Sequence, residues 1–272
     1  MNLLTRITLF PTLALLPFLA VGQANVSINN SLTVEQLVND YLLGGGVTAT
    51  NITFNGLPAD QVYIQAGLYE GPSEVVAFNQ GVVLATSNVN HVLTGSELGA
   101  TPNISDADLA IIAGHVINNA AVLEFDFVVN SDSIKFNYVF ASDEYPSFTC
   151  SSYNDPFGFF ISGPGIDGGG VFENNAMNIA LIPGTNTPVA INTVNSGTAS
   201  GGYDPQTCAQ ANPDWVEHSQ LYFQQNSNPG SNEVSYPGMT TTLTALASVE
   251  CGEQYHIKMA IGNASDQGYQ SG

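Results

Sequence analysis

The chain has 272 residues, 44% of them hydrophobic, and its 23 acidic residues outnumber three basic ones, giving a formal net charge of −20. A phosphate backbone or an anionic membrane surface requires a basic partner, so this charge excludes nucleic acid and disfavours a membrane surface. An acidic protein attracts cations such as Ca²⁺, although most of these carboxylates are expected only to keep the surface solvated.

The first 24 residues have the pattern of a secretory signal peptide. Arg6 precedes an apolar run of about 15 residues, and small residues follow up to Ala24. The run is shorter than the ~20 residues that cross a bilayer. We therefore expect cleavage near Ala24, a secreted or cell-surface product of residues 25–272, and no membrane span in that product.

Two amphipathic helices are predicted. Thr33, followed three residues later by Gln36, forms a capping-box pattern, and apolar residues at helical spacing continue to Leu43. A second helix is predicted from about 105 to 118, where Ser105 and Asp106 can cap the first turn. Its inward-facing stripe is expected to be Leu109, Ile112, Ala113 and Val116.

Most of the remaining chain has the pattern of short strands separated by turn residues. Many short strands with few helices predict an all-β fold, specifically a β-sandwich with the jelly roll as the favoured variant. The expected strands are 47–54, 61–66, 81–86, 121–129, 133–142, 157–162, 178–182, 189–194, 240–249 and 254–262.

The clearest strand pattern is at 121–129, where Leu123, Phe125 and Phe127 alternate with more polar residues. A short turn leads to 133–142, which alternates in the same way. Strict alternation indicates a strand with one buried face. We predict that the two segments form an antiparallel hairpin.

Residues 197–238 are rich in Asn, Gln, Ser, Pro and Gly, which predicts a long surface loop or insertion within a single domain of residues 25–272. Cys150, Cys208 and Cys251 fit an oxidising compartment in which one disulfide forms. Spacing alone leaves the connectivity open, and a bond between Cys150 and Cys208 would tie the loop to the core.

Candidate metal ligands follow the strand that ends near residue 142. Asp143, Glu144, Asn154 and Asp155 supply the hard oxygen atoms that Ca²⁺ prefers. Adjacent residues in a strand point to opposite faces, so Asp143 and Glu144 can share an ion only if the strand has ended. Their spacing matches no EF-hand loop. The alternative interpretation is a solvated acidic loop.

Paired carboxylates on a β-sandwich also raise the alternative of a glycoside hydrolase, whose two carboxylates lie ~5 to 9.5 Å apart. The sequence contains no HExxH motif and no G-x-S-x-G motif. We therefore expect a protein that is not an enzyme, and we name no catalytic and no cofactor-binding residue.

Residues 140–145 read Phe-Ala-Ser-Asp-Glu-Tyr, and residues 150–165 read Cys-Ser-Ser-Tyr-Asn-Asp-Pro-Phe-Gly-Phe-Phe-Ile-Ser-Gly-Pro-Gly. These stretches resemble the signature of the choice-of-anchor L domain family, and the resemblance extends over about residues 32–272. It implies a bacterial surface or secreted protein without a known activity. It also implies that a strand, then an anchoring or sorting segment, follows Gly272, so that this chain is C-terminally truncated.

These observations together predict an adhesin-like binding module for an extracellular glycan or protein ligand, with Ca²⁺ as a candidate stabilising ion. Two alternatives remain open at this point. One is a secreted carbohydrate-active hydrolase that uses paired carboxylates, and the other is a purely structural spacer of a surface protein.

Overall fold

The computed structural model describes residues 26–44, 47–96, 100–224 and 234–272. The predicted signal peptide, residues 1–24, lies outside them. In this part of the chain, 14 strands and a few short helices give a mainly β fold, which confirms the all-β prediction. None of the helices described there is long and apolar enough to cross a membrane.

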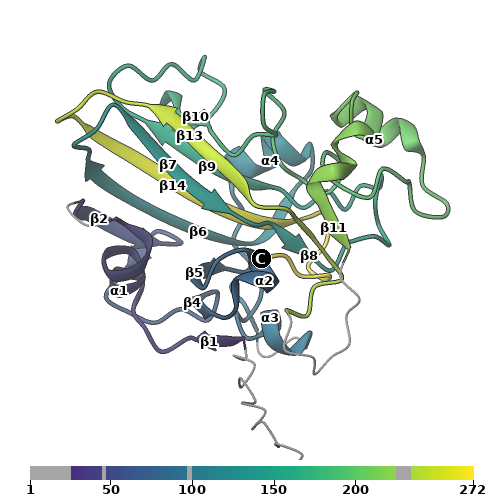
Figure 1. The fold of residues 1–272 in the computed structure, drawn as a ribbon, viewed down its shortest axis with the longest axis horizontal. Helices are drawn as coiled ribbons and strands as arrows, with labels where there is room; N and C mark the ends of the chain where they lie inside the picture. The colour runs from purple at the N-terminus through teal and green to yellow at the C-terminus, as the bar shows by residue number, and fades with distance from the viewer. Residues whose placement is uncertain (1–25, 45–46, 97–99, 225–233) are drawn as a thin grey trace, which may run out of the picture.

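Two long strands, β6 (Ile117–Val128) and β14 (Gln254–Ala264), form the centre of a six-stranded antiparallel sheet (Figure 1). Side chains alternate between the two faces of a strand, so Leu123, Phe125 and Phe127 of β6 point together into the main core. The sheet order is β10 (Met177–Asn178), β9 (Phe157–Ser162), β14, β6, β2 (Ala49–Phe54) and β3 (Leu57–Pro58).

A second layer packs on one face of this sheet and makes the fold a β-sandwich. Strand β7 (Ser133–Tyr138) pairs with β13 (Leu243–Ser248), and its Phe136 ring lies 5.4 Å from the Phe159 ring of β9. Two three-stranded sheets add side chains to the same core. One contains β1 (Ser27–Asn29), β4 (Ala66–Glu70) and β5 (Gln80–Leu84), and the other contains β11 (Tyr222–Gln224), β12 (Gly238–Thr240) and β8 (Ala141–Ser142).

The predicted hairpin between 121–129 and 133–142 is wrong. Strand β6 pairs with β14 and β2, whereas β7 pairs with β13 in the other layer. The turn after β6 hydrogen-bonds instead to the turn before β14, since Gly252 N donates to Val129 O over 2.8 Å. The chain thus changes layers at two neighbouring turns. Alternating side chains fit either layer, so the pattern did not reveal the crossing.

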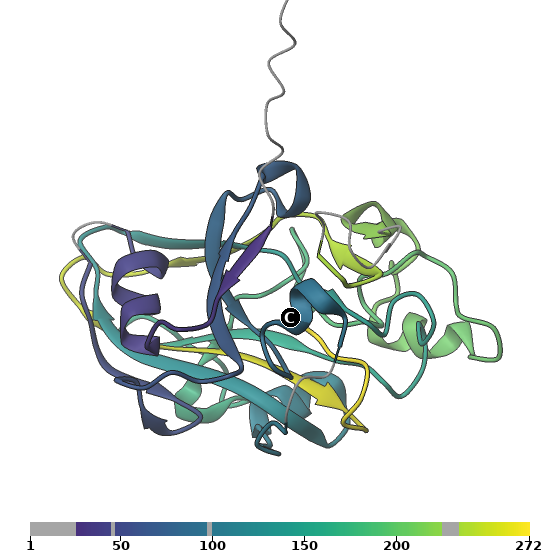
Figure 2. The same ribbon diagram turned by 90° about the horizontal axis from the view of Figure 1, so that it is seen from below.

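The N-terminal helix begins at the predicted capping box. Thr33 Oγ1 accepts a hydrogen bond from Gln36 N over 3.2 Å, and Gln36 Oε1 accepts one from Thr33 N over 2.9 Å. Helix α1 (Val34–Gln36) continues directly into the π-helix η1 (Leu37–Leu42). Figures 1 and 2 show this helical segment at one end of the molecule and α5 at the opposite end.

The second predicted helix is shorter than expected. Helix α4 (Ala107–Ala113) begins after Asp106, whose carboxylate accepts a hydrogen bond from Leu109 N over 2.8 Å. It ends at Gly114, whose φ of +71° lies in the left-handed region that glycine adopts readily. Val116, which was predicted to face inward, is 70% exposed because the chain has already left the helix.

Two segments predicted as strands, 61–66 and 189–194, have other conformations. In the first, the buried amide of Gln65 donates to Asn119 O over 3.0 Å, and the strand begins only at Ala66. The second is buried but folded into turns, with Val194 N donating to Ala190 O over 3.1 Å. In both places the short apolar run indicated burial, not extended backbone.

The segment 197–238 is more regular than the predicted loop. It contains α5 (Pro205–Ala211), the 3-10 helix η3 (Glu217–Leu221) and β11, and residues 225–233 lie outside the described structure. The remaining short helices are α2 (Ser73–Val76), α3 (His91–Thr94) and η2 (Glu173–Asn175).

A disulfide joins Cys150 to Cys208 and confirms the pairing that the sequence left open. Both cysteines are buried against Trp215 in a small cluster of their own. The bond therefore ties α5 to the loop between β8 and β9, while Cys251 is an exposed free thiol.

Replacing both Cys150 and Cys208 with serine should lower the free energy of unfolding by about 4 kcal/mol. The bond closes a loop with a sequence separation of 58 residues, and its loss restores that conformational freedom to the unfolded chain. Urea unfolding would measure the change, with Cys251→Ser as the matched control that should leave stability unaltered. A double variant as stable as wild type would contradict the prediction.

Candidate functional site

Four carboxylates meet where three distant segments of the chain come together. Asp143 and Glu144 follow β8, Asp155 precedes β9, and Asp266 follows β14. Burial raises the pKa of Glu144, and the charges of Asp155, Asp266 and Asp143 raise it further, so the four groups interact electrostatically. We call these four residues the carboxylate cluster.

Glu144 is the most isolated member of the cluster. Its side chain is 0% exposed, and neither carboxylate oxygen has a hydrogen-bond partner among the described residues. Burying an unpaired charge is costly. Burial, with the neighbouring negative charges, therefore raises the pKa of Glu144 from 4.5 to about 10. At neutral pH, Glu144 is an uncharged carboxylic acid.

Asp155 holds the C-terminal residues against the start of β9. Its Oδ1 accepts a hydrogen bond from Ala264 N over 2.8 Å, and its Oδ2 accepts one from Ser271 Oγ over 2.7 Å. Burial raises the pKa of Asp155, these two hydrogen bonds lower it, and the charges of Asp266 and Asp143 raise it, leaving it at about 8. Its two hydrogen bonds make Asp155 a structural link.

Asp143 lies at the edge of the cluster, with 22% of its side chain exposed. Its Oδ2 lies 2.6 Å from Nε2 of the buried His91 in α3, and its backbone N donates to Gln270 O over 2.9 Å. No sequence motif signals the pairing with His91, because the two residues are 52 positions apart.

Asn154, the fourth predicted calcium ligand, forms hydrogen bonds with residues outside the cluster. Its Oδ1 accepts a hydrogen bond from Asn192 N over 2.8 Å, and its Nδ2 donates to Ala113 O over 3.4 Å. Asp266 lies near the other three carboxylates instead. From the sequence, Asp266 could approach the loop of Asp143 and Glu144, but no spacing argument placed it there.

Within the described residues, no group of three or more His, Cys, Asp or Glu side chains is arranged to hold a metal ion. Asp143 faces His91, Asp155 faces its two donors, and Glu144 retains its proton. A bound cation would require Glu144 to lose that proton. The assignment of Ca²⁺ to Asp143, Glu144, Asn154 and Asp155 therefore stays a prediction.

An aromatic patch lies beside the cluster, on the same loop, on the same C-terminal segment and on the segment that precedes α5. The ring of Phe148 lies 4.6 Å from the ring of Tyr269, 5.3 Å from Tyr153 and 6.3 Å from Tyr203. Tyr269 is 51% exposed. We call these four residues the aromatic patch. Tyrosine presents a large rigid face and a polar hydroxyl, and it is enriched where proteins bind ligands.

Because Glu144 and Asp155 hold protons in the folded state, we predict that their contribution to the free energy of unfolding falls as pH rises. The folded-state pKa values of Glu144 and Asp155, about 10 and about 8, exceed their ordinary values of 4.5 and 3.8. The folded protein therefore retains protons that the unfolded chain releases. This contribution to stability is complete below about pH 4 and is lost as pH rises towards the folded-state pKa of each group.

In Glu144→Gln, the free energy of unfolding should fall less steeply between about pH 5 and about pH 8, by roughly 1.4 kcal/mol per pH unit. Urea unfolding at several pH values would measure the slope. Glu35→Gln, which changes an exposed carboxylate on α1, should retain the wild-type slope. A Glu144→Gln curve parallel to wild type would show that Glu144 is ionised in the folded protein.

A sequence model of the choice-of-anchor L domain matches residues 25–272, the whole of the chain after the predicted signal peptide. Neither the curated proteins nor the solved structures include a match to this chain. The matched range contains the carboxylate cluster, the aromatic patch and the disulfide. The chain therefore belongs to the choice-of-anchor L domain family, which indicates a surface-associated or extracellular bacterial protein.

Proposed function

We propose that this chain is a non-enzymatic, adhesin-like binding module of a bacterial cell surface, which binds an extracellular glycan or protein through the aromatic patch. The observation that carries the proposal is the position of the patch. Phe148 and Tyr153 belong to the loop that contains the cluster, and Tyr269 lies between Asp266 and Ser271. The buried cluster thus supports an exposed binding surface, and loops on a rigid scaffold commonly carry binding residues.

Burial of the two central carboxylates favours binding over glycoside hydrolysis. A glycosidase places its two carboxyl groups on either side of the bond that it cleaves. Glu144 and Asp155 are 0% exposed, so a sugar cannot reach either group in this conformation. We therefore assign the cluster a structural role.

Ca²⁺ is the ion that we propose for the cluster. The two unpartnered oxygens of Glu144 are hard donors of the kind that Ca²⁺ takes. A divalent cation would offset the repulsion among the four carboxylates and draw the loop of Asp143 towards the segment of Asp266. Binding would require Glu144 to release its proton and Asp143 to turn from His91.

Excess Ca²⁺ should raise the thermal midpoint relative to chelator. At a hundred times the dissociation constant, a ligand that binds only the folded state stabilises it by about 2.7 kcal/mol. The shift should be larger at about pH 8 than at about pH 6, because the ion displaces a proton from Glu144. Glu144→Gln should lose most of the shift. Equal midpoints with Ca²⁺ and with chelator would remove calcium from the proposal.

Tyr269→Ala should weaken binding to a glycan or extracellular-protein array by about thirtyfold, the effect of losing a central aromatic contact. Phe223→Ala is the matched control, because Phe223 is an aromatic residue, 54% exposed, on β11. Absence of binding to every array component would favour the structural spacer. Hydrolysis of a bound glycan that is lost in Glu144→Gln would favour the hydrolase.

A further inference from the structure

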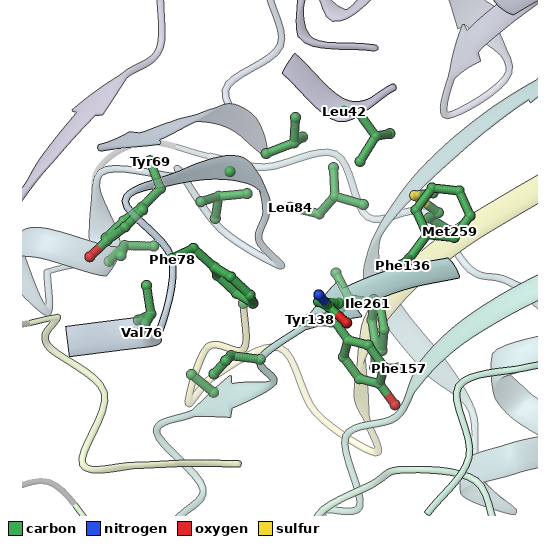
Figure 3. A pocket seen from close by; sticks show the side chains of 18 of the residues that line it. Leu42, Tyr69, Val76, Phe78, Leu84, Phe136, Tyr138, Phe157, Met259 and Ile261 are labelled. Carbon is green, nitrogen blue, oxygen red and sulfur yellow. The ribbon is translucent and has the colours of Figure 1, made fainter. Parts of the chain in front are cut away.

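A cavity of about 320 Å³ lies between the two layers (Figure 3), and none of the four carboxylates of the cluster lines it. Its floor is the inner face of the six-stranded sheet, formed by Leu123, Phe157, Met259 and Ile261. Figure 3 shows Phe78 and Leu84 on one side, facing Phe136 and Tyr138 on the other. The volume is in the range of ligand-binding pockets.

Two unpaired strand edges form the walls of this cavity. Residues 80–84 of β5 line one wall and residues 135–139, mainly β7, line the other. Strand β5 pairs only with β4, and β7 only with β13, among the described strands. Apart from the ladder partners in β4 and β13, no described residue forms a hydrogen bond with the backbone of residues 81–84 or 134–138. We call this space the β5–β7 groove.

The side chains of the groove are only partly covered, although they face the main core. Val82, Leu84, Phe136 and Phe157 are each half-buried and pack against the core cluster. The second layer therefore has a gap between β7 and β5 over an apolar floor. A gap bounded by two open edges has the form of a place for one more strand.

The charge of the groove differs from that of the rest of the molecule. Among the 25 described residues that line it, Lys135 is the only charged one, whereas the chain carries 23 acidic residues. Lys135 is exposed, and no ion pair joins it to a described residue. Lys258, in contrast, is buried and bonded to Asp106 over 2.9 Å and to Asp108. Lys135 thus offers the groove a free positive charge.

We propose that the β5–β7 groove binds an extended strand of a partner polypeptide, which pairs with both open edges and completes the second layer. This mode of recognition is β-strand addition, in which backbone hydrogen bonds give affinity and alternate side chains give specificity. The five residues of each wall correspond to a strand about 16 Å long.

The chemistry of the groove defines the partner strand. Its alternate side chains are apolar, because one face meets Leu123, Met259 and the half-buried aromatic residues of the groove. Its other face meets solvent beside Lys135, which lies next to the inward-pointing Phe136 and so points outward. A carboxylate on the outward face complements Lys135 as a cross-strand pair.

A fatty acid is the competing occupant, since it would also bring an apolar chain and a carboxylate. It would fill the floor but leave the backbone groups of β5 and β7 without partners. An extended peptide satisfies those groups as well, so the two open edges favour a peptide. The proposal goes beyond the surface-binding function, because it does not depend on the cluster or on the aromatic patch.

The test titrates the mature protein with a capped synthetic heptapeptide that has valine at the odd positions and threonine, glutamate and threonine between them. Calorimetry should detect binding, and the thermal midpoint should rise. The same peptide with N-methyl groups on its three polar residues keeps the side chains but loses backbone donors. It should bind at least about tenfold more weakly.

Three variants separate the groove from general adhesion. Phe136→Asp places a charge on the apolar wall and should abolish binding, and Lys135→Glu should weaken it by about fivefold while leaving the packing intact. Val116→Asp is the matched control, because Val116 is an apolar residue that is 70% exposed and does not line the groove. It should bind the peptide as wild type does.

Several results would overturn the proposal. These are equal affinity for the methylated and unmethylated peptides, no binding of either, or binding of decanoate with exclusion of the peptide. A dimer in light scattering that dissociates in Phe136→Asp would show that a second copy covers the groove instead. Tyr269→Ala should bind the peptide as wild type does, because Tyr269 does not line the groove. A failure of the groove proposal is therefore distinguishable from a failure of the proposed surface-binding function.

Discussion

The ladder between β6 and β14 is the constraint on which the rest of the structure depends. It places Met259 opposite Leu123 on the face that forms the groove floor, and it places Lys258 opposite Glu124 on the other face. There Lys258 reaches Asp106 at the start of α4. A slip of one residue would exchange the two faces of β14, so that Lys258 entered the core. The ladder also ends at Ala264, whose backbone N donates to Asp155 and fixes one side of the carboxylate cluster.

The carboxylate cluster differs from a set of surface carboxylates, because burial raises the pKa of Glu144 and of Asp155. A surface carboxylate keeps its charge in water, but Glu144 loses water on every side and has Asp155, Asp266 and Asp143 near it. Protonation removes most of the cost of burying it and leaves a neutral group without a hydrogen bond. Glu144 therefore keeps the remaining cost of a buried polar group that has no hydrogen-bond partner among the described residues.

The sequence predicted those features that depend on local periodicity or on residue type. Alternation identified β6, β14 and β7, the capping box located α1, and the carboxylates after residue 142 were recognised as a group. Prediction from the sequence failed where contacts between segments far apart in the chain determine the structure. The layer occupied by β7 depends on the turn at Gly252, and the fourth member of the cluster depends on where β14 ends. Asn154 stays a predicted ligand, and its side-chain oxygen accepts a hydrogen bond from Asn192 N, a contact that no local pattern indicates. The groove is a property of strand order, which no periodicity in one segment encodes.

The C-terminal residues connect the cluster with the groove. Ser271 donates to Asp155 through its hydroxyl, and its backbone N donates to Thr86, two residues after β5. Gly272 forms two backbone hydrogen bonds with Ala141 of β8, and both of these residues line the groove. Ser271 and Gly272 thus link Asp155 of the cluster to residues that line the groove. Coupling between two sites is reciprocal, so a strand that holds the groove in its present form also favours the present hydrogen bonds of Asp155.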